Sequence, residues 1–343
     1  MPIDRIMTIR IPPEVTDVWL NGSRYSAWVG ALSAEDRCTA SILALKEKNL
    51  HVSDGYIIDY GAELGHKTAT SRSLDNQWEM LLHAGRDVFK KEVQIEPMSP
   101  YAFQEFQAFL EGVLLKSKID FVLFDITCMT KIHLLALAAT LAKTPLTPRW
   151  SVVYAKPENY IALEHNPGWK DILIAPLGDT GFLLNEAFSR GIVIPGHEGD
   201  RLIVALSEME ASGGIILIAD TKGRPDLRSI TKNRNRRTIQ WLTNTRTGGW
   251  TSHVLREDAY SDIAQYVSKE VKIAKQYEAP IVLFPYGPKS LVFTVAKYLG
   301  MEYPERSWFV YPIPLAHAAE FSEGTERLIW ILPSNERLVS NKG

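Results

Sequence analysis

Two turns of the sequence combine a lysine, hydroxyl groups and the start of a predicted helix. Each turn follows a short apolar strand and precedes a segment in which apolar residues recur at helical spacing. The start of a helix carries unpaired N–H groups and a partial positive charge, so with a lysine it is suited to a nucleotide-like anion. The candidate ligand-binding residues are Thr127, Thr130 and Lys131 in the first turn, and Gly287, Lys289 and Ser290 in the second.

An ordinary capped helix with an exposed lysine is the alternative for either turn alone. Gly287 favours binding, because a glycine can take a positive φ or let a ligand approach the backbone closely. The occurrence of the same arrangement twice in one chain also favours binding.

A second pair of turns places acids and an arginine at predicted helix starts. The first reads Glu-Asp-Arg and ends at Arg37, and the second reads Glu-Gly-Asp-Arg and ends at Arg201. An acid at the N-cap with a local ion pair explains this pattern without a ligand. Ligand contact by Arg37 and Arg201 is the other interpretation. His197 precedes the second turn, and we expect it to lie in a solvated loop, with proton transfer as the alternative.

Acidic residues at strand ends open an enzyme alternative. Asp59, Asp125 and Asp220 end predicted strands, where a carboxylate can bind a divalent metal or a ribose hydroxyl, or cap a turn. In this alternative the protein is a nucleotide-processing hydrolase or glycosyl transferase, with Asp125, Asp220 or Glu198 as acid–base groups. The sequence contains no HExxH, GxSxG, paired CxxC or GxGxxG motif, so we assign no catalytic residue, metal or cofactor.

The charge balance and the cysteine content narrow the class of protein. Lys and Arg number 38 against 40 Asp and Glu, a net charge of -2, so the whole chain gives no argument for binding nucleic acid or an anionic membrane. Only Cys38 and Cys128 occur, each within apolar sequence, as expected of core residues in a reducing compartment. The longest apolar stretch, around residues 132–142, is too short to span a membrane. We expect a cytoplasmic protein without a membrane partner.

The order of predicted segments occurs twice along the 343 residues. Strands at 121–124 and 281–284 both end in Val-Leu-Phe, and each leads to one of the turn lysines. Gene duplication explains this most simply. Continuous apolar strands indicate parallel sheets covered by helices on both faces. We therefore predict an α/β fold of two tandem Rossmann-like halves, residues 1–165 and 166–343, with mainly parallel sheets and a pseudo-twofold internal duplication.

One concentrated basic run, from Lys222 to Arg237, follows the strand that ends at Asp220. Such a run could reach a phosphate-rich partner. We favour a solvated loop that passes into a helix, because aromatic residues begin only at Trp241.

The segment from Asp125 to Lys131, with the helix and the Val-Val-Tyr strand that follow it, resembles CRISPR-associated Rossmann fold (CARF) sensor domains. Those domains carry a strand, a Thr-Gly-Gly-Thr-Lys-like turn and a helix. Here Cys128 and Met129 stand at the two glycine positions, and the second half keeps Gly-Pro-Lys, ending at Lys289. The resemblance implies recognition of a cyclic oligonucleotide or a similar signal by two facing units, and a duplicated chain could supply both.

From this resemblance we expect a nucleotide-type ligand-binding protein, a sensor or regulatory subunit in a prokaryotic defence system that acts through a separate effector protein. We expect the two lysine turns to line one composite cleft, with Arg37 and Arg201 nearby, and no direct binding of nucleic acid. A scaffold subunit with a degenerate pocket is a further alternative, supported by Cys128 and Met129. Homodimer formation stays open.

Overall fold

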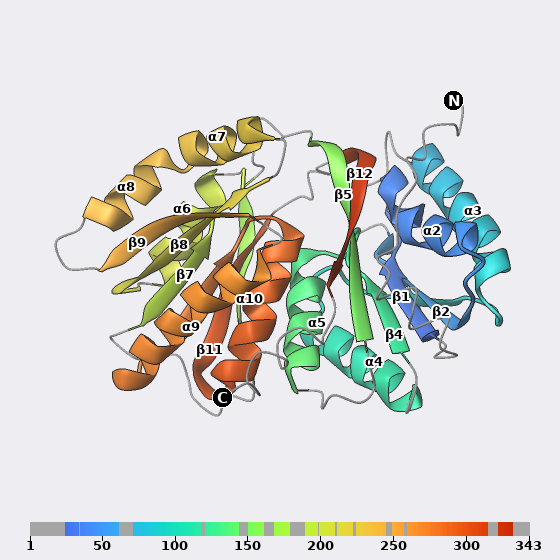
Figure 1. Ribbon diagram of the computed structural model, residues 1–343, viewed down its shortest axis with the longest axis horizontal. Coiled ribbons are helices and arrows are strands. Elements are labelled where there is room, and N and C mark those ends of the chain that lie inside the picture. The colour runs from blue at the N-terminus through green and yellow to red at the C-terminus, as the bar shows by residue number, and fades with distance from the viewer. Residues whose placement is uncertain are drawn as a thin grey trace. The chain divides into compact units, whose positions relative to one another are not determined.

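The computed structural model describes residues 25–33, 35–61, 71–117, 121–143, 150–160, 168–178, 189–197, 199–209, 211–221, 224–244, 249–256, 259–314 and 322–331 (Figure 1). These residues form two compact α/β units, each built on a six-stranded sheet. Unit 1 comprises Met1–Thr130, Thr144–Leu163 and His317–Gly343, and unit 2 comprises Lys131–Lys143 and Glu164–Ala316. The predicted fold class, two Rossmann-like halves with mainly parallel sheets, is confirmed.

Unit 1 contains sheet A, with the strand order β12-β5-β4-β1-β2-β3. Its elements are β1 (Tyr25–Ala31), the 3-10 helix η1 (Asp36–Thr39), α2 (Ala40–Glu47), β2 (Val52–Asp59), α3 (Ser71–Val88), β3 (Gln94–Pro97), α4 (Phe103–Lys116), β4 (Phe121–Asp125), β5 (Trp150–Tyr160) and β12 (Ser322–Ile331).

Unit 2 contains sheet B, with the strand order β6-β11-β10-β7-β8-β9. Its elements are α5 (Lys131–Lys143), β6 (Trp169–Pro176), β7 (Arg190–Ile194), α6 (Gly199–Glu208), β8 (Gly213–Asp220), α7 (Pro225–Arg234), α8 (Arg236–Asn244), β9 (Trp250–Arg256), α9 (Tyr260–Gln276), β10 (Ile281–Pro285), α10 (Lys289–Glu302), the 3-10 helix η3 (Pro304–Arg306) and β11 (Ser307–Pro314).

The five parallel strands of each sheet follow the same order, β5-β4-β1-β2-β3 in sheet A and β11-β10-β7-β8-β9 in sheet B. This identity of topology supports the duplication. It also places Lys131 and Lys289 at equivalent points, because each is the first residue of the helix between the fourth and fifth strands of its half.

A reciprocal strand exchange completes both sheets. Strand β6 comes next after β5 in the chain, yet it pairs antiparallel with β11 of sheet B. Strand β12 comes after β11 and pairs antiparallel with β5 of sheet A. A simple hairpin would have paired β5 with β6, so unit 1 depends on a strand from the end of the described chain. The units consequently interleave along the sequence, which differs from a single boundary between residues 165 and 166.

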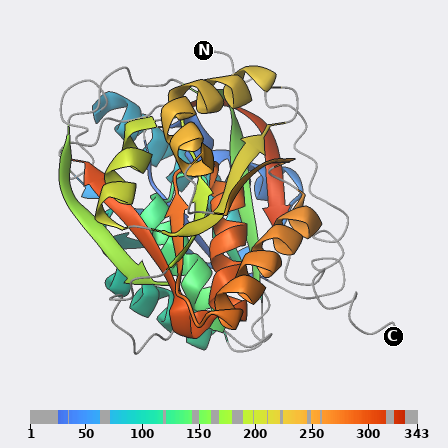
Figure 2. The ribbon, with the colours of Figure 1, turned by 90° about the vertical axis from the view of Figure 1, so that its left-hand side faces the viewer.

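Buried strands hold each unit together. Strands β4, β7 and β10 are buried at every residue, as expected of parallel strands covered on both faces. In unit 1, Trp28 is completely buried and packs against Phe89, with ring centroids 5.7 Å apart. In unit 2, α9 and α10 lie side by side, while α7 and α8 pack on β8 and β9 (Figures 1 and 2).

Removal of β12 should destabilise unit 1 selectively. A chain that ends at Ala316 loses Ile329 and Ile331, which are 7% and 8% exposed, a cost of roughly 3–6 kcal/mol for the two side chains. It also leaves β5 as an unpaired edge. Hydrogen exchange followed by mass spectrometry should show increased exchange in β5 and β4 but not in β10. A chain that ends at Pro333 is the control, and equal protection of β5 in the two chains would contradict the exchange.

Candidate functional site

The structure divides the predicted ligand-binding residues between the two units. Arg37, Thr127 and Thr130 belong to unit 1, and the chain passes into unit 2 at the next residue, Lys131. Each set therefore has its own surroundings. The residues in unit 2 are Lys131, Arg201, Gly287, Lys289 and Ser290.

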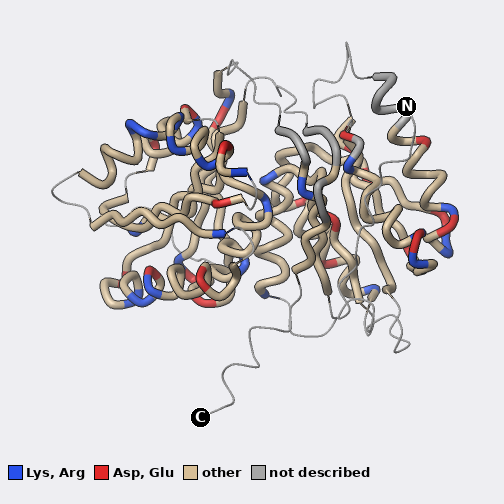
Figure 3. The backbone as a smooth tube through the Cα atoms, turned by 45° about the horizontal axis from the view of Figure 1, so that its top comes forward, with Lys and Arg blue, Asp and Glu red and all other residues tan. Residues whose placement is uncertain are grey.

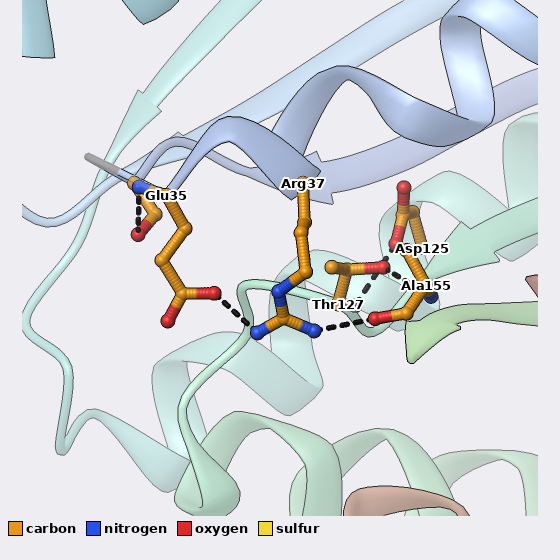
Figure 4. Close-up of polar contacts among 6 residues, drawn as sticks. Glu35, Arg37, Asp125, Thr127 and Ala155 are labelled. Atoms are coloured by element: carbon orange, nitrogen blue, oxygen red, sulfur yellow. Dashed lines mark hydrogen bonds and ion pairs between the residues drawn. The ribbon is translucent and has the colours of Figure 1, made fainter. Parts of the chain in front are cut away.

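Arg37 is buried inside unit 1, where it joins two segments of the chain. Its side chain is only 3% exposed. The guanidinium donates a hydrogen bond to the carbonyl of Ala155 in β5 and pairs with the carboxylate of Glu35 (Figure 4). The local ion pair that the sequence indicated is therefore present, and the same arginine ties η1 to the sheet.

A second set of hydrogen bonds fixes the end of β4. Asp125 accepts from the Thr127 backbone N–H at 2.9 Å and from the Ser41 hydroxyl. The Thr127 hydroxyl accepts from the N–H of Ala155 at 2.9 Å (Figure 4), and Ser41 accepts from the Trp28 indole at 3.1 Å. Asp125 and Thr127 are 2% and 1% exposed. Both side chains thus serve to join β4, β5 and α2.

Thr130 is also engaged inside unit 1. Its hydroxyl donates to the carbonyl of Pro100 at 2.8 Å, and its N–H donates to the Tyr60 hydroxyl at 3.2 Å. Burial raises the pKa of Tyr60, which keeps its hydroxyl protonated. Met129, at one of the two glycine positions of the CARF-like turn, is completely buried. Residues of unit 1 therefore fill the space around the first turn.

Lys131 is the exception in the first turn, because its ammonium group reaches the second turn. Its Nζ donates to the carbonyl of Tyr286 at 2.6 Å, and both residues belong to unit 2. Helix α5, which Lys131 opens, packs along α10, which Lys289 opens. The structure thus places Lys131, within unit 2, beside the second lysine turn.

Two glycines let the loops of sheet B approach each other closely. A Cβ atom on Gly196 would lie 2.3 Å from the carbonyl oxygen of Tyr286, and a Cβ on Gly287 would lie 2.4 Å from Cγ2 of Ile194. Gly287 has no positive φ, so its role is close approach between the loops after β7 and β10.

His197 lies beside these glycines and is half-buried, although the sequence favoured a solvated loop. Its Nδ1 is 3.0 Å from the Thr231 hydroxyl, and its carbonyl accepts from Arg234 Nη1 at 3.1 Å. Desolvation, followed by the nearby charges of Lys131 and Arg234, lowers the pKa of His197 to about 4. The imidazole is neutral at pH 7 in surroundings dominated by positive charge.

Arg201, the third residue of α6, adds another cation held by aromatic rings. Its Nη1 donates to the Tyr311 hydroxyl at 2.8 Å. Its guanidinium carbon lies 5.3 Å from the ring centroids of both Trp169 and Tyr311, within the range of cation–π attraction.

The start of α10 contributes a helix N-terminus. Pro288 is its N-cap residue, and no side chain caps the first turn. Lys289 is partly exposed there, whereas Ser290 is completely buried. Helix N-termini attract anions, so Lys289 and the backbone N–H groups reinforce the charge of Lys131.

This edge of sheet B is suited to binding an anion. Sequence reasoning missed Tyr286, Arg234 and Asn235, whose amide donates to the Gly196 carbonyl at 2.8 Å, because these contacts join distant segments. Asp220 pairs with Arg228 at 3.2 Å.

Within the described ranges, no three carboxylate, histidine or cysteine side chains are grouped to hold a metal ion. None of the helices in those ranges has the length and hydropathy of a membrane span.

The comparisons with known proteins do not indicate a function for this chain. No protein-family model matches the chain, and a search of curated proteins found no match. Among solved structures, a C2-type ketoreductase from a modular polyketide synthase is similar at 10% sequence identity, over 83% of this chain and 78% of that chain, with a TM-score of 0.19. A TM-score this low supports no argument about fold or function.

Substitution of Arg37 should cost stability rather than ligand affinity. Arg37→Met leaves the Glu35 carboxylate and the Ala155 carbonyl without their shared donor, so the free energy of unfolding should fall by about 3 kcal/mol. Urea denaturation measures it. Arg237→Met, at an exposed position, is the matched control and should change stability by less than about 0.5 kcal/mol. Equal effects of the two substitutions would contradict the bracing role.

The low pKa of His197 should make stability depend on pH in a defined window. Between pH 6.5 and about 4 the unfolded chain binds a proton at this residue and the folded chain does not, so stability should fall as the pH drops through that window. His197→Gln should reduce this loss, as measured by urea denaturation at several pH values. The exposed His51→Gln variant is the control, and identical pH profiles for His197→Gln and wild type would refute the assignment.

Proposed function

We propose that this protein binds a nucleotide-type ligand through a phosphate group at the carboxyl edge of sheet B. We further propose that it acts as a sensor or regulatory subunit in a prokaryotic defence system, as its resemblance to CARF domains implies, and that a separate effector protein receives the signal. The observation that carries the proposal is the reach of Lys131 to the Tyr286 carbonyl, which adds a cation from the first turn to the start of α10.

The electrostatics around His197 support a phosphate in particular. Lys131, Arg234 and Arg224 all disfavour protonation of His197, whereas Asp226 favours it, so the surroundings of the imidazole have too little negative charge to balance the cations. A bound phosphate would supply that charge and could accept hydrogen bonds from Lys131 and from backbone N–H groups at the start of α10. The glycines at 196 and 287 let the two loops approach each other closely.

Isothermal titration tests the proposal with cyclic oligoadenylates, dinucleotides, NAD and adenosine monophosphate, alongside inorganic phosphate as the control for a simple anion. We expect heat from at least one nucleotide class. Lys131→Ala should weaken that binding by about 10- to 100-fold, the size expected for a charge-assisted hydrogen bond. Lys143→Ala, at the other end of the same helix, should leave it unchanged.

Two results would overturn the proposal. One is the lack of binding heat with every nucleotide class, and the other is equal loss of affinity in Lys131→Ala and Lys143→Ala. Chromatography of the same mixtures distinguishes binding from turnover, because a cleaved nucleotide would support the hydrolase alternative with Asp220 or Glu198.

A further inference from the structure

The basic run after β8 is helical from Pro225 onward, and several of its side chains are exposed. Helix α7 begins at Pro225, and hydrogen bonds from Asn235 N–H to the Thr231 carbonyl and from Ile239 N–H to the Asn235 carbonyl continue the helical pattern into α8. The helix into which the sequence predicted that this run passes is therefore present, and Lys222 lies outside the described residues. We name as the α7–α8 surface the exposed residues Lys232, Asn233, Arg234, Arg236, Arg237, Gln240 and Trp241.

Basic residues outnumber acidic residues along α7 and α8, as the colouring of the backbone indicates (Figure 3). Residues 225–244 contain five Lys or Arg and one acid, Asp226. Helix α3, which follows the equivalent strand in unit 1, contains two Arg and three acids. The duplicated halves have thus diverged at this helix toward positive charge, against a whole-chain net charge of -2.

The outer cations of the surface lack acidic partners. Arg224 pairs with Asp226 at 2.8 Å and Arg228 pairs with Asp220 at 3.2 Å. By contrast, in the part of the chain that the structure describes, Lys232, Arg236 and Arg237 form no ion pair. Their charge is therefore available to an external anion.

Trp241 adds an aromatic ring to the same face. Its side chain is 58% exposed, and it lies one helical turn beyond Arg237. On the opposite face, Thr238 and Leu242 are buried and anchor α8 to the unit. The interval from Lys232 to Trp241 covers about 14 Å of helix, so cations and indole can contact neighbouring groups of one bound strand.

We propose that the α7–α8 surface binds single-stranded nucleic acid, with Lys232, Arg236 and Arg237 on phosphates and Trp241 stacked on a base. An exposed indole beside several cations fits this partner, because unpaired bases offer flat faces for stacking while the backbone supplies regularly spaced charge. A duplex conceals those faces. An acidic peptide satisfies the cations and leaves the indole without a flat partner.

Fluorescence polarisation with a labelled 12-nucleotide oligo-uridine or oligo-thymidine measures the binding in about 50 mM salt. Arg236→Glu/Arg237→Glu should weaken it at least tenfold. Two lost phosphate contacts should also reduce the slope of log K against log salt by roughly 1.4, at about 0.7 per contact on a single strand. Trp241→Ala should weaken binding by about 5- to 150-fold, the range of stacking on one base.

Lys269→Glu/Lys272→Glu is the matched control, since both lysines are exposed on α9 of the same unit and the change in net charge is equal. It should retain affinity and slope. Lys131→Ala should also retain oligonucleotide binding, so failure of the nucleotide site and failure of this surface are distinguishable. All substituted positions except Lys131 are exposed, and circular dichroism confirms that each variant is folded.

Binding that is lost in the α8 double variant and in Trp241→Ala, and kept in the α9 control, supports the proposal. Equal loss in the α8 and α9 double variants would show that only net charge matters and would overturn it. Absence of oligonucleotide binding by the wild-type chain, or a preference for duplex or for polyglutamate over the single strand, would also overturn it.

Discussion

The exchange of β6 and β12 is the constraint on which the rest of the structure depends. Each sheet has five parallel strands in the same order and is closed at one edge by an antiparallel strand that follows the other sheet in the chain. Because the central strands β4, β7 and β10 are buried at every residue, polar side chains with a functional role are expected beyond the ends of these strands and on the covering helices. The carboxyl edge of each sheet is therefore where the two halves can be compared.

The two carboxyl edges have diverged. In unit 1 the edge is occupied by a closed set of hydrogen bonds, in which Asp125 and Thr127 are almost completely buried and Arg37 joins η1 to β5. In unit 2 the edge gathers positive charge around a neutral His197, and Lys131 contributes to it from the first lysine turn. The same divergence extends to the helix after the second strand, which is basic only in unit 2. The edge in unit 1 is thus closed by internal hydrogen bonds, whereas the edge in unit 2 gathers positive charge.

Local sequence patterns predicted the helices and strands, whereas contacts between distant segments determine what the individual side chains do. The apolar strands and the helix starts at Lys131 and Lys289 follow from short-range periodicity. The strand exchange could not be predicted from the sequence. The local pattern of an edge strand indicates that it is a strand, but it does not indicate which sheet the strand joins. Burial of Arg37 depends on Ala155, more than a hundred residues away. The helical start at Pro225 was available from the sequence, since proline favours the first position of a helix.

We propose that the edge of sheet B holds the phosphate of a nucleotide. A crystal of the protein soaked with 8-bromoadenosine 5′-monophosphate tests it most directly, because bromine gives an anomalous signal that fixes the base and the electron density then fixes the phosphate. We expect a phosphate within hydrogen-bonding distance of Lys131 Nζ and beside His197. A nucleotide bound elsewhere, with no density at this position under saturating conditions, would contradict it.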